Sequence, residues 1–501
     1  MKTLFNSIAL SFSGGGYRAA CFSLGTLSLF DKINLLQNVE ALSTVSGGTI
    51  SGTKYAQSQI EGKSFDVFFK EYYNQLKEDK LLKNAMSHIE GGHVWKQSMN
   101  RHKRQNPINA FAIEYNKHLS QHTLGDIQDA IVQKRTHLKR VVFNATDFSS
   151  GLQFRFQNIE GTKFRFGNKG AHKYKDLIPK LKLGDILASS SAFPGGFEPI
   201  SFPHDFVKSK KDSEEIGLMD GGIVDNQGAS VFIKNNPEDN PHDLIFICDV
   251  ASPYMESFKY ADKNGATIFI TYLSSLPALL LVLFLTILFF KNHWWILYTI
   301  SIVLESFMFL MQLLFFIASR KLKKATGIEK GLVIPPRRIG LFLLDRMNSV
   351  LKMASDVFLK NDRRQNANSI YKDYNRNIVT ATIYELRCEE DGKPENEKQW
   401  DEIKVHTGEI SEAIKKVSLK SSAFGTTLWF SKKDQENNVL DALIACGEYT
   451  ACYNLIAHLV RYYSDDIKIQ YSEAHLLLDK LKLIWKEFMD DPYFLVNYRK
   501  K

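Results

Sequence analysis

The sequence has little cysteine and carries no internal repeat or low-complexity tract. Its 501 residues include five cysteines, and these are Cys21, Cys248, Cys388, Cys446 and Cys452. The number is odd, the positions are scattered, and most stand inside apolar runs, so a disulfide framework is excluded. Reduced thiols of a cytosolic protein fit this pattern better.

Acidic residues are fewer than basic ones, and no nucleic-acid-binding motif stands out. Lys and Arg number 64 against 55 Asp and Glu, which gives a net charge of +9. Such an excess favours either nucleic acid or an anionic membrane surface. Without a nucleic-acid motif, the sequence favours the membrane and predicts no nucleic-acid partner.

No metal or organic cofactor is implied by the motifs. No loop has the spacing of calcium ligands, and the pair His88 and His93 is separated by Gly91 and Gly92, which speaks against a helix presenting both rings to a metal. The length allows two or three domains, or one large domain with insertions.

Two glycine-rich motifs near the start of the chain suggest a serine nucleophile. Ser46 lies in the run Ser43-Thr44-Val45-Ser46-Gly47-Gly48, after a predicted strand over 39–45. A serine on a tight strand-to-helix turn needs small neighbours, and Gly47 and Gly48 meet that need. Thr44 does not, and we expect its side chain to crowd the turn.

The second motif, Ser13-Gly14-Gly15-Gly16-Tyr17-Arg18, could aim several backbone N–H groups at one point, because no Cβ blocks the approach. Such amides could hold the oxyanion that a serine attack creates. Each motif alone has a structural alternative, an ordinary strand-to-helix loop or a helix N-cap serine.

A third motif supplies a base. Asp220-Gly221-Gly222 follows the apolar run 216–219, where a strand would end. An aspartate there could accept the Ser46 proton, although an aspartate before two glycines is also common in ordinary turns.

These three motifs, in this order, resemble those of the patatin-like phospholipases, over roughly residues 5–255. The run from Ala188 to Pro194 is similar to the small-residue stretch of that family. The resemblance implies a Ser46–Asp220 dyad without a catalytic histidine. It also implies an oxyanion hole at Gly14, Gly15 and Gly16, and a basic residue near the substrate phosphate at Arg18.

Alternating patterns predict an α/β fold with a mainly parallel sheet. Strands are expected over 5–13, 39–45, 139–146, 152–167, 243–250 and 378–386, and helices over 17–33, 60–135, 407–420 and 437–463. With the resemblance, this predicts a three-layer α/β/α patatin-like hydrolase. The basic cluster 100–104 reads either as a solvated face or as a contact with anionic headgroups.

A long apolar stretch interrupts this pattern. Residues 267–290 and 294–318 are each long enough to cross a bilayer, and the polar break 291–293 makes them a transmembrane hairpin. Basic residues 320–324 follow, so both ends and the enzyme body are expected to face the cytoplasm. Glu305, near the middle of the second span, has three alternatives: a hydrogen bond to the partner helix, a contact between copies of the chain, or a hairpin that lies shallow.

Three regions are therefore expected: a catalytic domain over 1–260, the hairpin over 261–325, and a C-terminal α/β region over 326–501 that completes or buttresses the first. An amphipathic helix should open the last region at 343–357, and 389–402 should form a charged loop. The resemblance implies a membrane-anchored serine lipid acyl hydrolase acting on membrane phospholipids. An acyltransferase or thioesterase with the same dyad, and an inactive membrane scaffold, remain alternatives.

Overall fold

The computed structural model describes residues 4–118, 121–158, 165–168, 172–208, 215–233, 242–254, 257–258, 276–326, 345–358, 360–361, 364–365, 375–388 and 397–501. The chain forms two compact units. The first combines Met1–Pro253 with Phe358–Lys501, and the second is Tyr254–Val357.

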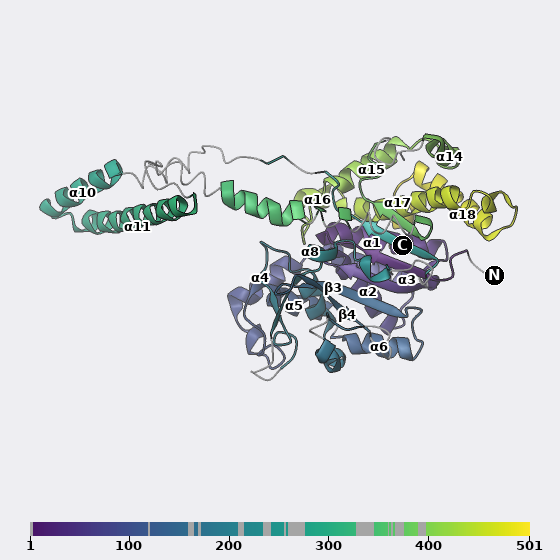
Figure 1. Cartoon of the computed structure of the whole chain (residues 1–501), viewed down its shortest axis with the longest axis horizontal. Coiled ribbons are helices and arrows are strands. Elements are labelled where there is room, and N and C mark those ends of the chain that lie inside the picture. Colours follow the sequence, from purple (N-terminus) through teal and green to yellow (C-terminus); the bar gives the residue numbers. More distant parts are fainter. Residues whose placement is uncertain are drawn as a thin grey trace. The chain divides into compact units, whose positions relative to one another are not determined.

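An eight-stranded mixed sheet organises the first unit (Figure 1). Five parallel strands form its centre in the order β3, β2, β1, β7, β8, and these are Arg140–Asp147, Val39–Val45, Ile8–Phe12, Leu244–Asp249 and Ile378–Thr382. Strands β4 (Leu152–Gln157) and β6 (Ile216–Asp220) pair antiparallel with β3, and β5 (Ile200–Phe202) pairs antiparallel with β6. The mainly parallel α/β fold predicted from the sequence is confirmed.

The central strands are buried on both faces. Ile8, Leu10 and Phe12 of β1 point into the large core, whereas Ala9 points into a smaller cluster with Ile245 and Ile247 of β7. Strands buried on both sides read as continuous apolar runs, which is why β1 and β7 could be recognised in the sequence.

Helices α1 (Gly16–Lys32), α2 (Gly47–Ile60) and α17 (Val439–Tyr462) pack on the large core, and α1 and α17 lie against each other. Their crossing is close because Gly25 and Gly447 face the partner backbone: a Cβ at either would stand 2.0 Å from a carbonyl oxygen of the other helix. The C-terminal segment therefore adds both β8 and α17 to the fold that the N-terminal segment begins.

This unit contains further helices. They are α3 (Phe65–Glu78), α4 (Leu81–Gly91), α5 (Pro107–His118), α6 (Leu124–Val132), α7 (Leu183–Ser190), α8 (Gly222–Asp225), α14 (Glu397–Thr407), α15 (Glu412–Ala423), α16 (Lys432–Glu436), α18 (Glu473–Asp490) and α19 (Phe494–Lys500).

The second unit contains two apolar helices that run side by side, α10 (Leu276–Lys291) and α11 (Trp295–Thr326) (Figure 1). Within α11, Trp295–Leu314 is long and apolar enough to cross a membrane, and only 11% of its most apolar window is buried. The first predicted span is not confirmed at full length, because the apolar helix is Pro277–Lys291 and residues 267–275 lie outside the described residues.

Several other predictions differ from the structure. Strand β4 ends at Gln157, short of residue 167, and α14 begins at Glu397 where a loop was expected. The sequence reading also missed α18 and α19. Of the expected amphipathic helix, 345–352 is helical and Met353–Phe358 is a π-helix, while residues 343 and 344 lie outside the described part.

The interpretation of the basic cluster 100–104 as a solvated face is wrong for Lys103, whereas Arg101 and Arg104 are exposed. Lys103 is buried and donates to the Asp185 carboxylate at 2.8 Å, and the Arg104 guanidinium pairs with Glu215. Lys103 is neutralised within the protein and is therefore not a headgroup site, whereas Arg104 forms its ion pair at the solvent surface.

Candidate active site

Ser46 stands at the turn between β2 and α2, in a backbone conformation that side-chain-bearing residues rarely adopt. Its φ is 50° and its ψ is −118°. A strained strand-to-helix turn of this kind exposes a nucleophile above the sheet edge, at a cost of about 1–3 kcal/mol. The surrounding contacts must therefore hold the turn in place.

The two glycines after Ser46 allow this turn to pack against the glycine-rich loop. A Cβ at Gly47 would stand 2.1 Å from the Gly16 carbonyl oxygen, and one at Gly48 would stand 2.6 Å from the Phe12 carbonyl oxygen. The Gly48 amide also donates to the Ser13 carbonyl at 3.2 Å. The two motifs seen in the sequence therefore interlock through their backbones.

Thr44 does not crowd the turn as expected. Its methyl group lies over Gly52, where a Cβ would stand 2.5 Å from Thr44 Cγ2, and its hydroxyl lies 3.0 Å from the Thr49 hydroxyl. The space that Thr44 needs is supplied by a glycine one turn along α2.

The sheet register brings Asp220 to Ser46. Val45, the last residue of β2, pairs with Asn144 of β3, and Asp220, the last residue of β6, pairs with Ala145. Strand β4 occupies one edge of β3, so β2 and β6 both pair with the opposite edge. They run toward each other along that edge, and their carboxyl ends meet.

The Asp220 carboxylate is buried, and the Ser46 hydroxyl lies beside it. The Gly222 amide donates to its Oδ1 at 2.8 Å. Burial raises the pKa of Asp220 from 3.8 to about 6, although the neighbouring Ser46 hydroxyl and the Gly222 amide both lower it. A carboxylate with a pKa near 6 is ionised at neutral pH and is a stronger base than an exposed aspartate.

The glycine-rich loop presents two amides, rather than three, as candidate oxyanion donors. Gly15 has φ 145° and Gly16 has φ 57°, values that favour glycine. Within the described part of the chain, neither N–H has a hydrogen-bond partner, whereas the Gly14 amide donates to the Asn226 carbonyl at 3.0 Å. The predicted role of the Gly14 amide as an oxyanion donor is therefore corrected: this amide instead holds the glycine-rich loop in place.

A glycine is still required at position 14, because a side chain there would clash with its neighbours. A Cβ there would stand 2.5 Å from Asn226 Oδ1 and 3.3 Å from Ser46 Cβ. Gly221 and Gly222 serve the same purpose beside Asp220: a Cβ at Gly221 would meet the Asn144 carbonyl at 2.4 Å, and one at Gly222 would meet Asn226 Oδ1 at 2.6 Å.

Sequence reasoning missed Ser190 and Asn226. Ser190, at the end of α7, accepts the Ser46 N–H at 2.9 Å, donates to the Asn144 carbonyl at 2.6 Å and lies 2.9 Å from the Thr49 hydroxyl. The small-residue run 188–194 contained Ser190, but nothing in the sequence showed which hydroxyl reaches the turn. Asn226 follows Asp220 by six residues and lies beside Gly14 and Gly222.

Arg18 makes its contacts with the C-terminal segment. The buried guanidinium donates to the Phe424 carbonyl at 2.9 Å and to the Tyr384 hydroxyl at 3.2 Å, and burial lowers its pKa. Among the described residues it has no hydrogen bond to Ser46 or Asp220, so its contacts indicate a structural role. Substrate binding by Arg18 stays a prediction that this geometry does not support.

Metal-ligand geometry does not appear in the described ranges, where no group of three or more His, Cys, Asp or Glu could hold an ion. His88 instead contacts the buried carboxylate of Glu114, which Lys117 also pairs.

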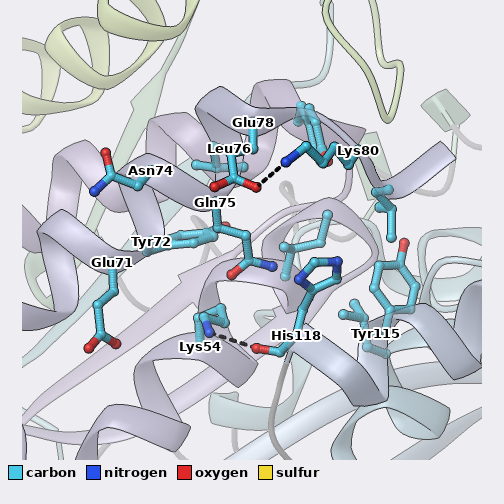
Figure 2. A pocket seen from close by; sticks show the side chains of 14 residues that line it. Lys54, Glu71, Tyr72, Asn74, Gln75, Leu76, Glu78, Lys80, Tyr115 and His118 are labelled. Atoms are coloured by element: carbon cyan, nitrogen blue, oxygen red, sulfur yellow. Dashed lines mark hydrogen bonds and ion pairs between the residues drawn. The ribbon is translucent and has the colours of Figure 1, made fainter. Parts of the chain in front are cut away.

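A cavity of about 380 Å³ lies close to the site, between α2, α3, α4 and α5 (Figure 2). Ile50, one turn after Ser46, and Tyr17, directly after Gly16, belong to its wall, as does Leu187 of α7.

The serine turn, the glycine-rich loop and the aspartate at the end of β6 lie within a region that matches a known family model. The model is that of the patatin-like phospholipases, and it matches residues 10–233. This region is a patatin-like phospholipase domain. The resemblance seen in the sequence is confirmed, and membership of this family supports lipid acyl hydrolysis as the class of activity.

Two solved structures are similar to this chain. A human GIVD cytosolic phospholipase A2 is 13% identical, with a TM-score of 0.33, over 49% of this chain and 43% of that one. VipD from Legionella pneumophila is 13% identical, with a TM-score of 0.25, over 99% of this chain and 84% of that one. The chain thus spans less than half the length of the human phospholipase. No curated protein sequence matches it.

Proposed function

We propose that this protein is a membrane-anchored serine hydrolase that cleaves acyl esters of phospholipids or related lipids. The observation that carries the proposal is the position of the strained Ser46 beside the buried Asp220 carboxylate, whose pKa is raised to about 6. A nucleophile beside a base of matched pKa is the arrangement that covalent acyl transfer needs.

The reaction follows from these positions. Asp220 takes the Ser46 proton as Ser46 Oγ attacks the ester carbonyl carbon. The amides of Gly15, Gly16 and Gly47, which follows the nucleophile, hold the tetrahedral oxyanion. The protonated Asp220 then gives its proton to the leaving alcohol oxygen, and an acyl-enzyme remains. A water molecule, deprotonated by Asp220, attacks this ester, releases the fatty acid and restores Ser46.

The arrangement of the hairpin supports membrane anchoring. The side chains between α10 and α11 include Thr286, Ser301 and the amide of Gln312, and Met308 is buried with them. Large apolar side chains point outward, and Phe284, Ile296 and Phe309 are 62%, 79% and 62% exposed. Polar groups inside and apolar groups outside suit a hydrocarbon solvent and not water.

The span of α11 fits the same solvent. Twenty residues at about 1.5 Å rise give about 30 Å, the thickness of a hydrocarbon core. We propose that α11 crosses the bilayer or inserts deeply into it, with the enzyme body on the cytoplasmic side, so that lipid reaches the site without crossing water. Association between copies through these helices remains part of the proposal.

Fatty-acid release tests the proposed function. The purified full-length protein is mixed with liposomes of several phospholipids, and products are measured by mass spectrometry for the parent, Ser46→Ala and Asp220→Asn. Release by the parent alone is expected, and Ser58→Ala is the matched control, since Ser58 is a buried serine of α2 that donates to the Tyr55 carbonyl. Equal release by the parent and Ser46→Ala would contradict the assignment.

Adding alcohol or thiol acceptors to the same reaction separates hydrolysis from acyl transfer. Free fatty acid as the main product supports hydrolysis, because water is then the acceptor. A dominant new ester or thioester would instead favour the acyltransferase alternative.

A further inference from the structure

The cavity beside the active site has a sharp division between apolar and polar walls. Seven of its side chains are nearly fully buried and apolar or aromatic, and these are Tyr17, Ile50, Tyr72, Leu76, Leu81, Tyr115 and Leu187. Its exposed walls carry only polar side chains, among them Glu71, Asn74, Glu78 and Lys80 (Figure 2). A cavity with this division suits a ligand with an apolar chain inside and a polar head at the rim.

The volume is large enough for such a chain. About 380 Å³ falls within the usual range of ligand pockets, and an apolar cavity of roughly 150 Å³ already holds a benzene molecule. Ser46 and Asp220 do not line this cavity, so it is a site separate from the catalytic pair.

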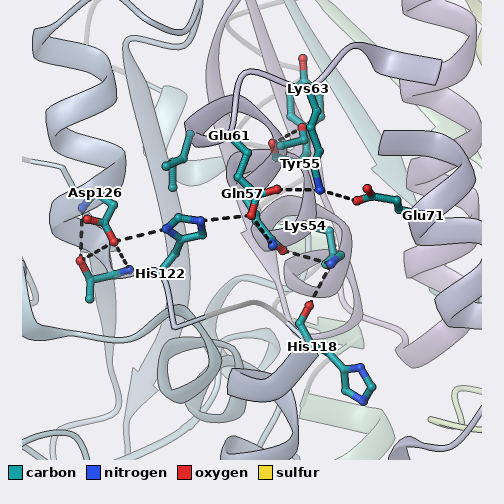
Figure 3. Close-up of polar contacts among 12 residues, drawn as sticks. Lys54, Tyr55, Gln57, Glu61, Lys63, Glu71, His118, His122 and Asp126 are labelled. Atoms are coloured by element: carbon teal, nitrogen blue, oxygen red, sulfur yellow. Dashed lines mark hydrogen bonds and ion pairs between the residues drawn. The ribbon is translucent and has the colours of Figure 1, made fainter. Parts of the chain in front are cut away.

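The charged side chains at the rim determine which polar head group a ligand of this cavity would carry. Lys54 is partly buried there, and its ammonium group donates only to neutral acceptors, the His118 carbonyl at 2.9 Å and Gln57 Oε1 at 3.0 Å (Figure 3). Among the described residues, Lys54 forms no ion pair.

The nearby carboxylates are already engaged. Lys63 lies 2.8 Å from Glu61 and 2.6 Å from Glu71, and His122 lies 3.2 Å from Glu61. At the opposite rim, Glu78 pairs with Lys80 at 3.0 Å (Figure 2). Lys54 is therefore a rim cation without an anion in ion-pair contact, although Glu61 and Glu71 act on its charge from a longer distance.

We propose that this cavity binds a long-chain fatty acid, with its hydrocarbon chain among the buried apolar side chains and its carboxylate on Lys54. Such a ligand brings a carboxylate into direct contact with Lys54 and fills the apolar interior. It goes beyond the proposed function, because binding needs neither Ser46 nor hydrolysis. Since Tyr17 and Ile50 adjoin the glycine-rich loop and the serine turn, an occupied cavity lies next to the catalytic backbone.

Binding is tested on the Ser46→Ala protein, which removes the nucleophile from the measurement. The probe is cis-parinaric acid, a fluorescent polyunsaturated fatty acid, added to the detergent-solubilised full-length chain below the critical micelle concentration of the probe. Saturable binding that oleate displaces is expected. Oleyl alcohol and lysophosphatidylcholine should displace the probe about tenfold less well, because neither brings a net anion to Lys54.

Two further substitutions in the same background locate the site. Lys54→Gln should weaken binding about tenfold or more by removing the cation, and Leu81→Trp should weaken it by filling the interior. Val67→Trp, which adds the same ring on the exposed face of α3 outside the cavity, should bind like Ser46→Ala alone. Thermal melting checks that each variant is folded.

Unchanged affinity in folded Lys54→Gln and Leu81→Trp would overturn the proposal, as would the absence of saturable binding. Displacement by lysophosphatidylcholine as strong as that by oleate would assign the cavity to a phospholipid instead and also overturn it. If the liposome assay fails while these binding results hold, the proposed catalytic function is wrong and the fatty-acid site stands.

Discussion

The sheet unit and the hairpin place the same residue types in opposite positions, with large apolar side chains buried in the sheet unit and exposed in the hairpin. In the sheet unit, Phe143, Phe154 and Phe156 are buried and fully shielded from solvent. In the hairpin, Phe284 and Phe309 stand outside, whereas Thr286 and Ser301 lie between the helices. On our proposal, the two units are built for different solvents, water for the first and hydrocarbon for the second.

The largest expected effect comes from making one chemical change in both units. Phe309→Lys places a charge on the outward face of α11, which should disfavour membrane insertion by about 3 kcal/mol at the bilayer centre. Val132→Lys, at a 70% exposed position of α6, should have no effect on membrane association. Carbonate extraction of membranes measures the membrane association of both variants. Equal extraction of the two would show that the exposed face of α11 does not contact the bilayer.

The second effect concerns the buried charge that the sheet unit retains. Because the pKa of Asp220 is raised from 3.8 to about 6 on folding, its ionisation disfavours the folded state. This penalty is absent below about pH 4 and complete above about pH 6, where it reaches about 3 kcal/mol. Asp220→Asn should therefore melt higher than the parent at pH 8 and equally at pH 4.

Urea or thermal unfolding in detergent at the two pH values checks this. If the parent is as stable as Asp220→Asn at pH 8, ionisation of Asp220 does not destabilise the folded protein, and the raised pKa is wrong.

A smaller effect is expected where α1 crosses α17. Gly447→Ala puts a methyl group against the Phe22 carbonyl, where a Cβ would stand 2.0 Å away, and should destabilise the sheet unit by about 2 kcal/mol. Gly91→Ala is the control, since no atom lies within 4 Å of a Cβ there, and it should be stabilising by about 0.5 kcal/mol. Opposite signs in thermal melting are the expected result; a shared sign would contradict the close crossing.

The smallest effect concerns the support of the serine turn. Ser190→Ala removes the acceptor of the Ser46 N–H, so the strained turn relaxes and kcat should fall about tenfold with little change in KM. Ser189→Ala is the matched control, because this neighbouring buried serine bonds only within α7, to the Ile186 carbonyl. Equal kcat values for the two variants would remove Ser190 from the positioning network.

Much of this fold could be predicted because its central strands are apolar runs that end in small residues. The bounds of β2 and the positions of Ser46 and Asp220 at strand ends followed from local patterns alone. The meeting of these two residues did not, because it depends on β6 sharing an edge of β3 with β2.

The errors have the same origin in long-range contacts. Gly14 lost its predicted donor role because Asn226, 212 positions later, accepts its amide, and Arg18 is held by Tyr384 and Phe424. Thr44 fits because Gly52 gives it room. Each contact partner lies on another element, so the local sequence pattern around these residues could not predict the contact.

Labelling with a fluorophosphonate, which reacts with activated serines, is a direct test of whether Ser46 is a nucleophile activated by Asp220. We expect mass spectrometry to find the adduct on Ser46, Ser46→Ala to abolish it, and Asp220→Asn to slow its formation strongly. Labelling of the parent should rise with pH through a midpoint near 6, as the Asp220 carboxylate ionises. An adduct on a different serine, or equal rates in the parent and Asp220→Asn, would contradict the account.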